Sequence, residues 1–322
     1  MNAYLASILT LAGIWAILAL SLNLVVGYAG QVSLAQGALF GIGAYTAGIA
    51  STRYGVGFPI DLLISVMVTA LAGALLAIPA IRVRHDFLVL TTLGINFVVV
   101  ALFQNVDFFG GSQGIVGIPL IALGDELLTA QEVFYLIAAL VAATVGSQWL
   151  LLRTWFGLRM IAIRDDEQAA SASGISVAST KIWAFVLCGA YAGVAGGVYA
   201  HFIGSLFPTS FGFIESVTIL AMVILGGAGT IAGPLVAAVL LRSLPEQLRF
   251  LQDWRLVVYG TLLAVAIRYQ PAGLLGHGSF LRRALARLRG GRGRATVVLP
   301  GEGDDGPRDD GDLPDPSTRA SR

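Results

Sequence analysis

The chain has 322 residues, of which 56% are apolar and only 12% are charged, against roughly 25% charged in an average soluble domain. Residues 281–322 hold seven of the acids and nine of the bases, which leaves twelve acids and eleven bases in the first 280 residues. So few charges cannot cover the surface of a soluble domain of that size. Lipid must cover it, and the net charge of +1 favours no polyanionic partner such as a nucleic acid.

The chain has few residues that bind metals or form disulfides. Cys188 is the only cysteine, so no disulfide can form within the chain. The three histidines, His85, His201 and His277, are far apart and form no ligand motif. We therefore expect neither metal catalysis nor a bound cofactor.

Apolar runs in chain order predict the membrane-spanning helices, each of which needs roughly 20 apolar residues. Glycines and a proline interrupt the seventh run, and the eighth is short. The sequence predicts an all-α polytopic membrane protein with about eight to ten transmembrane helices and broken or re-entrant segments. The runs cover residues 4–26, 33–50, 60–81, 87–104, 132–152, 182–203, 217–241 and 256–267.

The basic residues predict which loops face the cytoplasm, where arginine and lysine accumulate. Arg82 and Arg84, and the bases of the loop 153–181, mark two such loops, whereas the loop 107–131 has acids and no base. Eight simple spans would place the arginine-rich tail outside. Splitting 217–241 at its glycines into two segments restores a cytoplasmic tail, and we favour that split.

The composition divides the chain into a transmembrane domain, residues 1–280, and a tail, residues 281–322. The tail is basic at first and then acidic, and it is rich in glycine and proline. Such a segment cannot bury enough apolar surface to fold, so we expect it to be disordered. Its basic start either lies against anionic lipid headgroups or is simply solvated.

A glycine-rich break, residues 27–37, follows the first span. Non-helical backbone at membrane depth persists only where protein or a water-filled cavity satisfies it. The break is therefore a candidate lining of a transport path, and the alternatives are a tight interfacial turn or close helix packing. Its candidate residues are Gly27, Gly30, Gln31, Ser33 and Gln36.

A second break resembles the first. The run 27–33 parallels 226–232, with Gly226, Gly227 and Gly229 as candidate path residues. Paired glycine-interrupted segments are typical of transporter repeats, although seven small residues can also match by chance. Asn23 and Asn96 lie inside spans and are candidates for the path or for hydrogen bonds between helices.

Acidic residues inside the spans are scarce. Asp61 and Glu215 are expected near span ends, at the outer headgroups, where their cost is low. No acid is expected at mid-span, which disfavours a proton-coupled transporter.

The loop 153–181 carries the remaining pattern. Leu158, Ile161, Ala162 and Ala169 recur at helical spacing, which predicts one short amphipathic helix ending at Gly174. Such a helix on the cytoplasmic face can dock in a groove of a soluble partner, and a solvated connector is the alternative.

Several further segments form a pattern along the chain. They are Gly157–Ala170 with Ser173-Gly174-Ile175, Leu22–Leu34, Phe40–Tyr45, Met222–Thr230 with Gly233-Pro234, and Pro271–Gly276. Together they resemble branched-chain amino acid ABC permeases, the LivH/LivM family, and are closer to the LivM side. The resemblance covers about residues 5–276, in order, and leaves out the tail.

The resemblance implies a transport subunit of the bacterial inner membrane and not an enzyme. Its implied partners are a second, LivH-like permease, two cytoplasmic ABC ATPases and an extracytoplasmic substrate-binding protein that delivers leucine, isoleucine or valine. No Gly-x4-Gly-Lys-[Ser/Thr] phosphate loop occurs, so ATP chemistry is left to the partners. By resemblance, the ATPase-coupling residues are Gly157, Arg159, Arg164, Asp165, Asp166, Glu167, Ala169, Ala170 and Gly174.

The sequence departs from the family pattern in one place, and several alternative functions compete with this interpretation. The coupling motif of the broader importer family begins Glu-Ala-Ala, whereas this chain has Gln168 before Ala169 and Ala170. Related permeases carry urea or short amides, so the cargo has alternatives. A stand-alone secondary transporter or channel is disfavoured by the large cytoplasmic loop and the absence of mid-span acids. A membrane enzyme is disfavoured because no cluster of acids, histidines or arginines occurs beyond Arg164-Asp165-Asp166-Glu167.

Overall fold

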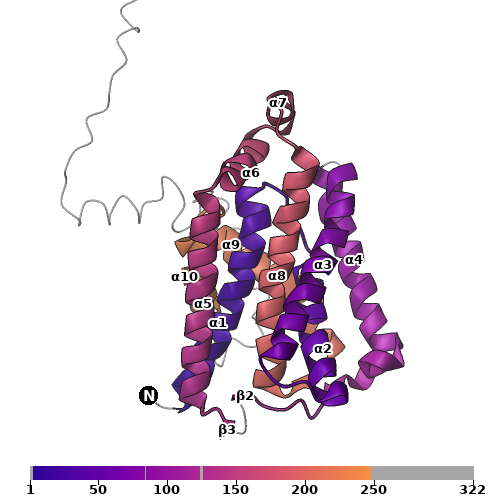
Figure 1. Ribbon diagram of the computed structural model, residues 1–322, viewed down its shortest axis with the longest axis vertical. Coiled ribbons are helices and arrows are strands. Elements are labelled where there is room, and N and C mark those ends of the chain that lie inside the picture. The colour runs from indigo at the N-terminus through magenta and orange to yellow at the C-terminus, as the bar shows by residue number, and fades with distance from the viewer. Residues whose placement is uncertain (1–2, 84, 124–125, 248–322) are drawn as a thin grey trace, which may run out of the picture. The chain divides into compact units, whose positions relative to one another are not determined.

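A computed structural model describes residues 3–83, 85–123 and 126–247 (Figure 1). Within these residues, six segments are long and apolar enough to cross a membrane. The predicted class, an all-α multi-pass membrane protein, is confirmed. The six segments are Tyr4–Tyr28, Ile60–Arg82, Phe87–Asn105, Ala130–Leu152, Val177–Ile203 and Pro208–Gly226.

The elements follow one another with short connections. The first half of the chain has α1 (Ala3–Asn23), the π-helical turn η1 (Leu24–Tyr28), α2 (Gln36–Tyr54), α3 (Ile60–Arg82), α4 (His85–Asn105), η2 (Asp107–Phe109), η3 (Gly111–Gln113), β1 (Ile115–Val116), β2 (Ala122–Leu123) and β3 (Glu126–Leu127). The second half has α5 (Ala130–Leu152), α6 (Trp155–Asp165), α7 (Glu167–Ala172), α8 (Val177–Ile203), β4 (Ser205–Leu206), η4 (Pro208–Phe211), α9 (Phe213–Gly226) and α10 (Ala232–Gln247).

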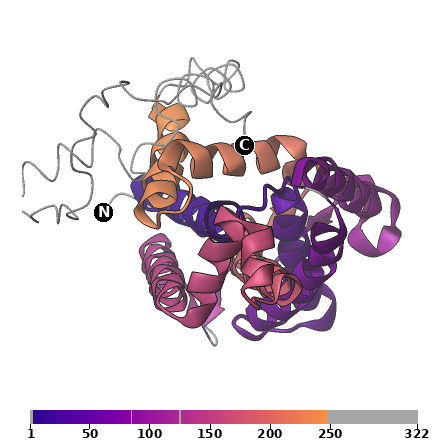
Figure 2. The same cartoon turned by 90° about the horizontal axis from the view of Figure 1, so that it is seen from above.

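Helices α1 and α8 form the middle of the bundle (Figure 2). Helix α8 packs against α3, α2 and α1, and α1 packs in addition against α5 and α10. The peripheral helices expose large apolar side chains, such as Leu71 of α3 at 65% and Val98 of α4 at 63%. A soluble protein would bury side chains of this kind, so these surfaces are suited to lipid.

Small residues bring α3 and α8 into close contact. A Cβ atom added at Gly189 of α8 would overlap the carbonyl oxygen of Thr69, and one added at Gly193 would lie 2.8 Å from the Cα of Val66. The Ser65 hydroxyl of α3 donates to the carbonyl oxygens of Gly43, at 2.8 Å, and Gly193, at 3.0 Å. Close backbone packing of this type drives helix association in lipid, where burying apolar surface gives little gain.

The bundle has two distinct ends. Helices α6 and α7 belong to the loop 153–181, which we call the coupling loop after the role that the resemblance implies. They lie at one end of the bundle, the coupling-loop end, and β2 and β3 lie at the other, the opposite end (Figure 1). Lys181 at the start of α8 reaches the carbonyl oxygen of Ala80 in α3, at 3.4 Å, so the α3–α4 connection shares the coupling-loop end. This agrees with the prediction that the two basic loops share one face.

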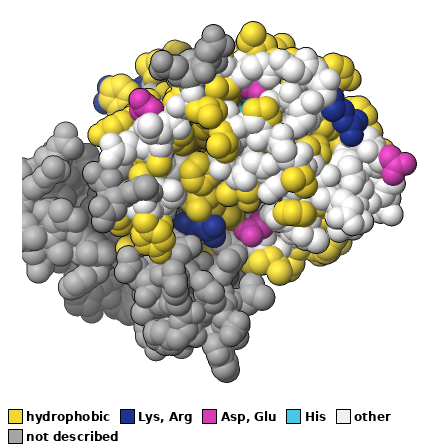
Figure 3. All heavy atoms as spheres, turned by 90° about the horizontal axis from the view of Figure 1, so that it is seen from below, with side chains coloured by type: hydrophobic (Ala, Val, Ile, Leu, Met, Phe, Trp, Pro, Cys, Tyr) yellow, Lys and Arg dark blue, Asp and Glu magenta, His cyan; other side chains and the backbone are white. Residues whose placement is uncertain are grey.

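Two small antiparallel sheets belong to the opposite end. Strand β1 pairs with β4, with Ile115 opposite Leu206, and β2 pairs with β3, with Ala122 opposite Leu127. Charged side chains are few and scattered on the described part of this face (Figure 3).

Most predicted spans correspond to helices, but not every boundary is correct. Helix α8 begins at Val177 instead of 182, and α9 begins at Phe213 instead of 217. The predicted break within 217–241 is confirmed, because the chain leaves the helix between α9 and α10, whereas the extra membrane crossing and the cytoplasmic tail stay predictions. The final span, 256–267, and the tail, 281–322, lie outside the described residues, so the helix count and the domain boundary stay predictions.

Candidate functional site

The two glycine breaks meet at the coupling-loop end of the bundle. The first contains the π-helical turn η1 at the end of α1, and the second is the segment between α9 and α10. A Cβ atom added at Gly27 would overlap the backbone nitrogen of Gly229. The two segments that the sequence singled out as similar are therefore in direct backbone contact.

Asn23, the last residue of α1, joins this helix to the second break. Its Nδ2 atom donates to the carbonyl oxygen of Thr230 at 2.8 Å, and its Oδ1 atom accepts from the backbone N–H of Gly229 at 2.9 Å. The side chain is fully buried. Of the two roles predicted for Asn23, the geometry favours the hydrogen bond between segments.

Arg164, in the last turn of α6, connects the coupling loop to the same place. Its Nη1 atom donates to the carbonyl oxygen of Gly27 at 2.6 Å. Gly30, at φ +69°, packs against the aliphatic part of this side chain, with an added Cβ only 3.1 Å from the Cγ of Arg164. A predicted coupling residue and the predicted break residues thus form one cluster.

The coupling loop itself differs from the prediction of one amphipathic helix. It forms two helices, α6 and α7, separated at Asp166. The Asp166 carboxylate accepts from the backbone N–H groups of Gln168, at 2.8 Å, and Ala169, at 2.9 Å, and so caps α7. An N-cap residue has extended backbone, which is why the helix breaks here; Gly174, at φ +83°, follows α7 as predicted.

The remaining coupling residues divide into buried and exposed groups. Glu167 makes an ion pair with the buried Lys181, at 2.8 Å, and so ties α7 to α8. Ala170 and Gly157 are buried, and a Cβ atom added at Gly157 would overlap the backbone of Leu152 at the end of α5. Three others face outward, where a partner could reach them: Arg159, Asp165 and Ala169.

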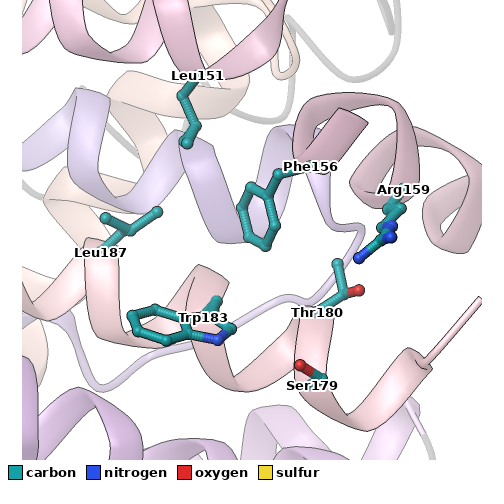
Figure 4. Close-up of a pocket in the computed structure, with 7 residues that line it drawn as sticks. All are labelled: Leu151, Phe156, Arg159, Ser179, Thr180, Trp183 and Leu187. Atoms are coloured by element: carbon teal, nitrogen blue, oxygen red, sulfur yellow. The ribbon is translucent and has the colours of Figure 1, made fainter. Parts of the chain in front are cut away.

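A cavity of about 400 Å³ lies between α5, α6 and α8 beside the coupling loop (Figure 4). Arg159, Ser179 and Thr180 gather at one end of it, whereas Leu151 and Leu187 lie at the other. The two arginines of α6 therefore have different neighbours, since Arg159 lies beside α8 and Arg164 contacts the glycine breaks.

The other path candidates are buried within this subunit. Gln31, Ser33 and Gln36 are each at most 4% exposed. Gln36 donates to the Ser21 hydroxyl at 3.0 Å, and Ser33 accepts from the backbone N–H of Ala35 at 3.3 Å. Asn96 is buried in α4, and its side chain makes no hydrogen bond to the described residues.

Sequence reasoning missed a polar pair at the opposite end. Nε2 of His201, near the end of α8, lies 2.6 Å from the Asp61 carboxylate in the first turn of α3, and both side chains are buried. Asp61 lies at a span end, as predicted, and its side chain is in addition buried within the protein. His201 Nδ1 lies 2.7 Å from the carbonyl oxygen of Pro119. No local pattern links residues so far apart, so no sequence signal could have found the pair.

Comparison with known proteins agrees with this architecture. The family model "Branched-chain amino acid transport system / permease component" matches residues 4–267. The chain belongs to this family. No solved structure matches the permease.

The permease resembles individual family members over most of its length. It is 34% identical to the high-affinity branched-chain amino acid transport system permease protein LivM of Salmonella typhimurium and 35% identical to that of Escherichia coli. Both alignments cover 83% of this chain and 69% of the relative. The autoinducer 2 import system permease protein LsrC of Klebsiella pneumoniae is 30% identical, over 88% of this chain and 80% of its own.

Proposed function

We propose that this permease is the LivM-like membrane subunit of an ABC importer in the bacterial inner membrane, and that it translocates leucine, isoleucine and valine. Its expected partners are a LivH-like second permease, two cytoplasmic ABC ATPases and an extracytoplasmic substrate-binding protein. ATP hydrolysis belongs to the ATPase subunits. The C-terminal tail is cytoplasmic in this arrangement.

The observation that carries this proposal is the structure of the coupling loop. Helices α6 and α7 project from one end of the bundle, with outward-facing side chains on both helices. The Glu167–Lys181 ion pair fixes the loop to α8. A short helical segment that is exposed on one side and firmly attached on the other suits a docking element that passes force from a soluble partner into the membrane helices.

The likeness to LivM proteins supports branched-chain amino acids as cargo. The LsrC likeness shows that a family member of comparable length is named for a different cargo. Cargo therefore needs its own measurement, with xylose, autoinducer 2, urea and a short amide as competitors.

Reconstitution in proteoliposomes tests the proposal. The permease is purified together with the second permease and the two ATPases, and uptake of labelled leucine is measured with the binding protein present. We expect uptake that requires internal ATP and that isoleucine and valine inhibit. Uptake driven by an ion gradient without the ATPases would overturn the importer assignment, and inhibition by urea or xylose alone would overturn the cargo.

A further inference from the structure

The carbonyl group of Gly27 lies in the last turn of the first helix, where backbone carbonyls have no donor within the helix. The π-helical turn η1 ends at Tyr28, and the backbone N–H of Gln31 donates to the carbonyl oxygen of Val25 at 2.9 Å. The guanidinium of Arg164 supplies the donor for the Gly27 carbonyl. π-helical turns often occur at functional sites.

Two glycines let the segments approach closely enough for these bonds. An added Cβ at Gly27 would overlap Asn23 Oδ1 as well as the nitrogen of Gly229. Gly229 has φ +81°, and an added Cβ there would lie 2.6 Å from Arg164 Nη1. Any larger side chain at Gly27 or Gly229 would separate the breaks or displace the arginine.

The three side-chain hydrogen bonds connect three separate parts of the chain. Arg164 links α6 to the first break, and the amide of Asn23 links the end of α1, which leads into that break, to the second break through both its donor and its acceptor. Arg164 as a residue is exposed, but Asn23 is fully buried. The linkage therefore runs from the surface of the coupling loop into the interior of the bundle.

We propose that Arg164 and Asn23 are positioning residues that transmit movement of the coupling loop to the two glycine breaks. When an ATPase subunit moves α6 and α7, the hydrogen bond from Arg164 displaces the Gly27 carbonyl with them. Asn23 then makes the two breaks move as one unit, because its amide is bonded to the backbone of the second break. This inference rests on the proposed function and adds the residues that couple ATP hydrolysis to transport.

The test measures coupling and assembly separately in the reconstituted importer. In Arg164→Gln we expect ATPase subunits to co-purify in the normal ratio and ATP hydrolysis to continue. Leucine transported per ATP hydrolysed should fall about tenfold or more, which is the scale of a lost charge-assisted hydrogen bond. Arg164→Lys keeps a cationic donor and should retain an intermediate ratio. Arg53→Gln, the same chemical change at the far end of α2, is the matched control.

Asn23 provides a second, independent arm. Asn23→Asp loses the donor to Thr230 and should lower the transport-to-ATP ratio in the same way, whereas Asn105→Asp on the exposed end of α4 should not. If both residues belong to one linkage, the double variant Asn23→Asp with Arg164→Gln should lose little more than the worse single variant, because the effects of connected residues do not add.

Two outcomes would overturn the inference. One is an unchanged transport-to-ATP ratio in both single variants, and the other is loss of ATPase co-purification, which would make Arg164 a docking or folding residue. Both are distinguishable from failure of the proposed function, because that failure would appear in the unaltered complex as absence of ATP-dependent uptake.

Discussion

Polar side chains hold neighbouring segments together at both ends of the permease, but the groups that they bond to differ between the ends. At the coupling-loop end, Asn23 and Arg164 bond to backbone groups of glycine-rich segments. At the opposite end, Asp61 and His201 pair inside the protein, with both side chains at most 1% exposed.

This difference has a mechanical consequence. Amide and backbone groups that separate can find new partners in a neighbouring backbone or in water, at a cost of about 1 kcal/mol for each bond. A carboxylate separated from its imidazole would be left buried without a partner, which is far more costly. We therefore expect the Asp61–His201 contact at the opposite end to resist separation more strongly than the bonds of Asn23 and Arg164 at the coupling-loop end.

The largest expected effect comes from breaking the opposite end. Asp61→Ala leaves His201 buried without its carboxylate, and removal of one partner of a buried pair costs about 3–5 kcal/mol. We expect a lower yield and a lower thermal midpoint of the purified protein, measured by thermal unfolding in detergent. Asp107→Ala removes an exposed acid from η2 and serves as the control. If the Asp61→Ala protein were as stable as its control, the Asp61–His201 pair would not stabilise the opposite end.

A smaller effect is expected where the middle of α3 packs on the middle of α8, between the two ends. Gly189→Val places a side chain into the backbone of Thr69, and overpacking of this kind costs about 1–3 kcal/mol. Gly94→Val in α4 is the matched control, since nothing lies within 4 Å of an added Cβ there. The thermal midpoint of Gly189→Val should be lower than that of Gly94→Val, and the reverse order would contradict close packing of α3 and α8.

The smallest expected effect concerns the cap of α7 at the coupling-loop end. Asp166→Ala removes the acceptor for two backbone N–H groups, and loss of an N-cap costs about 1 kcal/mol. We expect the immobilised permease to retain roughly fivefold fewer ATPase subunits, because about 1 kcal/mol changes an equilibrium constant by about that factor. Asp165→Ala, one residue away and without a capping role, separates the cap from simple loss of charge. Equal losses in both variants would assign the effect to charge and not to α7.

The sequence predicted the elements better than the contacts between them. Helix α3 was expected over 60–81 and spans Ile60–Arg82, because a long apolar run fixes a membrane helix by length alone. The single helix expected in the coupling loop was wrong, since the apolar spacing continues across Asp166 while its carboxylate caps a new helix. Helices α8 and α9 begin earlier than predicted because they extend beyond their apolar runs.

By itself, the sequence determined the membrane class, the approximate spans and the two glycine breaks, since these follow from local composition and from the thickness of a bilayer. Only the tertiary structure decided that the breaks touch, that Arg164 reaches Gly27, and that Asp61 pairs with His201. Asn23 and Thr230 are 207 positions apart in the chain. Contacts over such separations depend on how the helices pack, and no local pattern of residues encodes them.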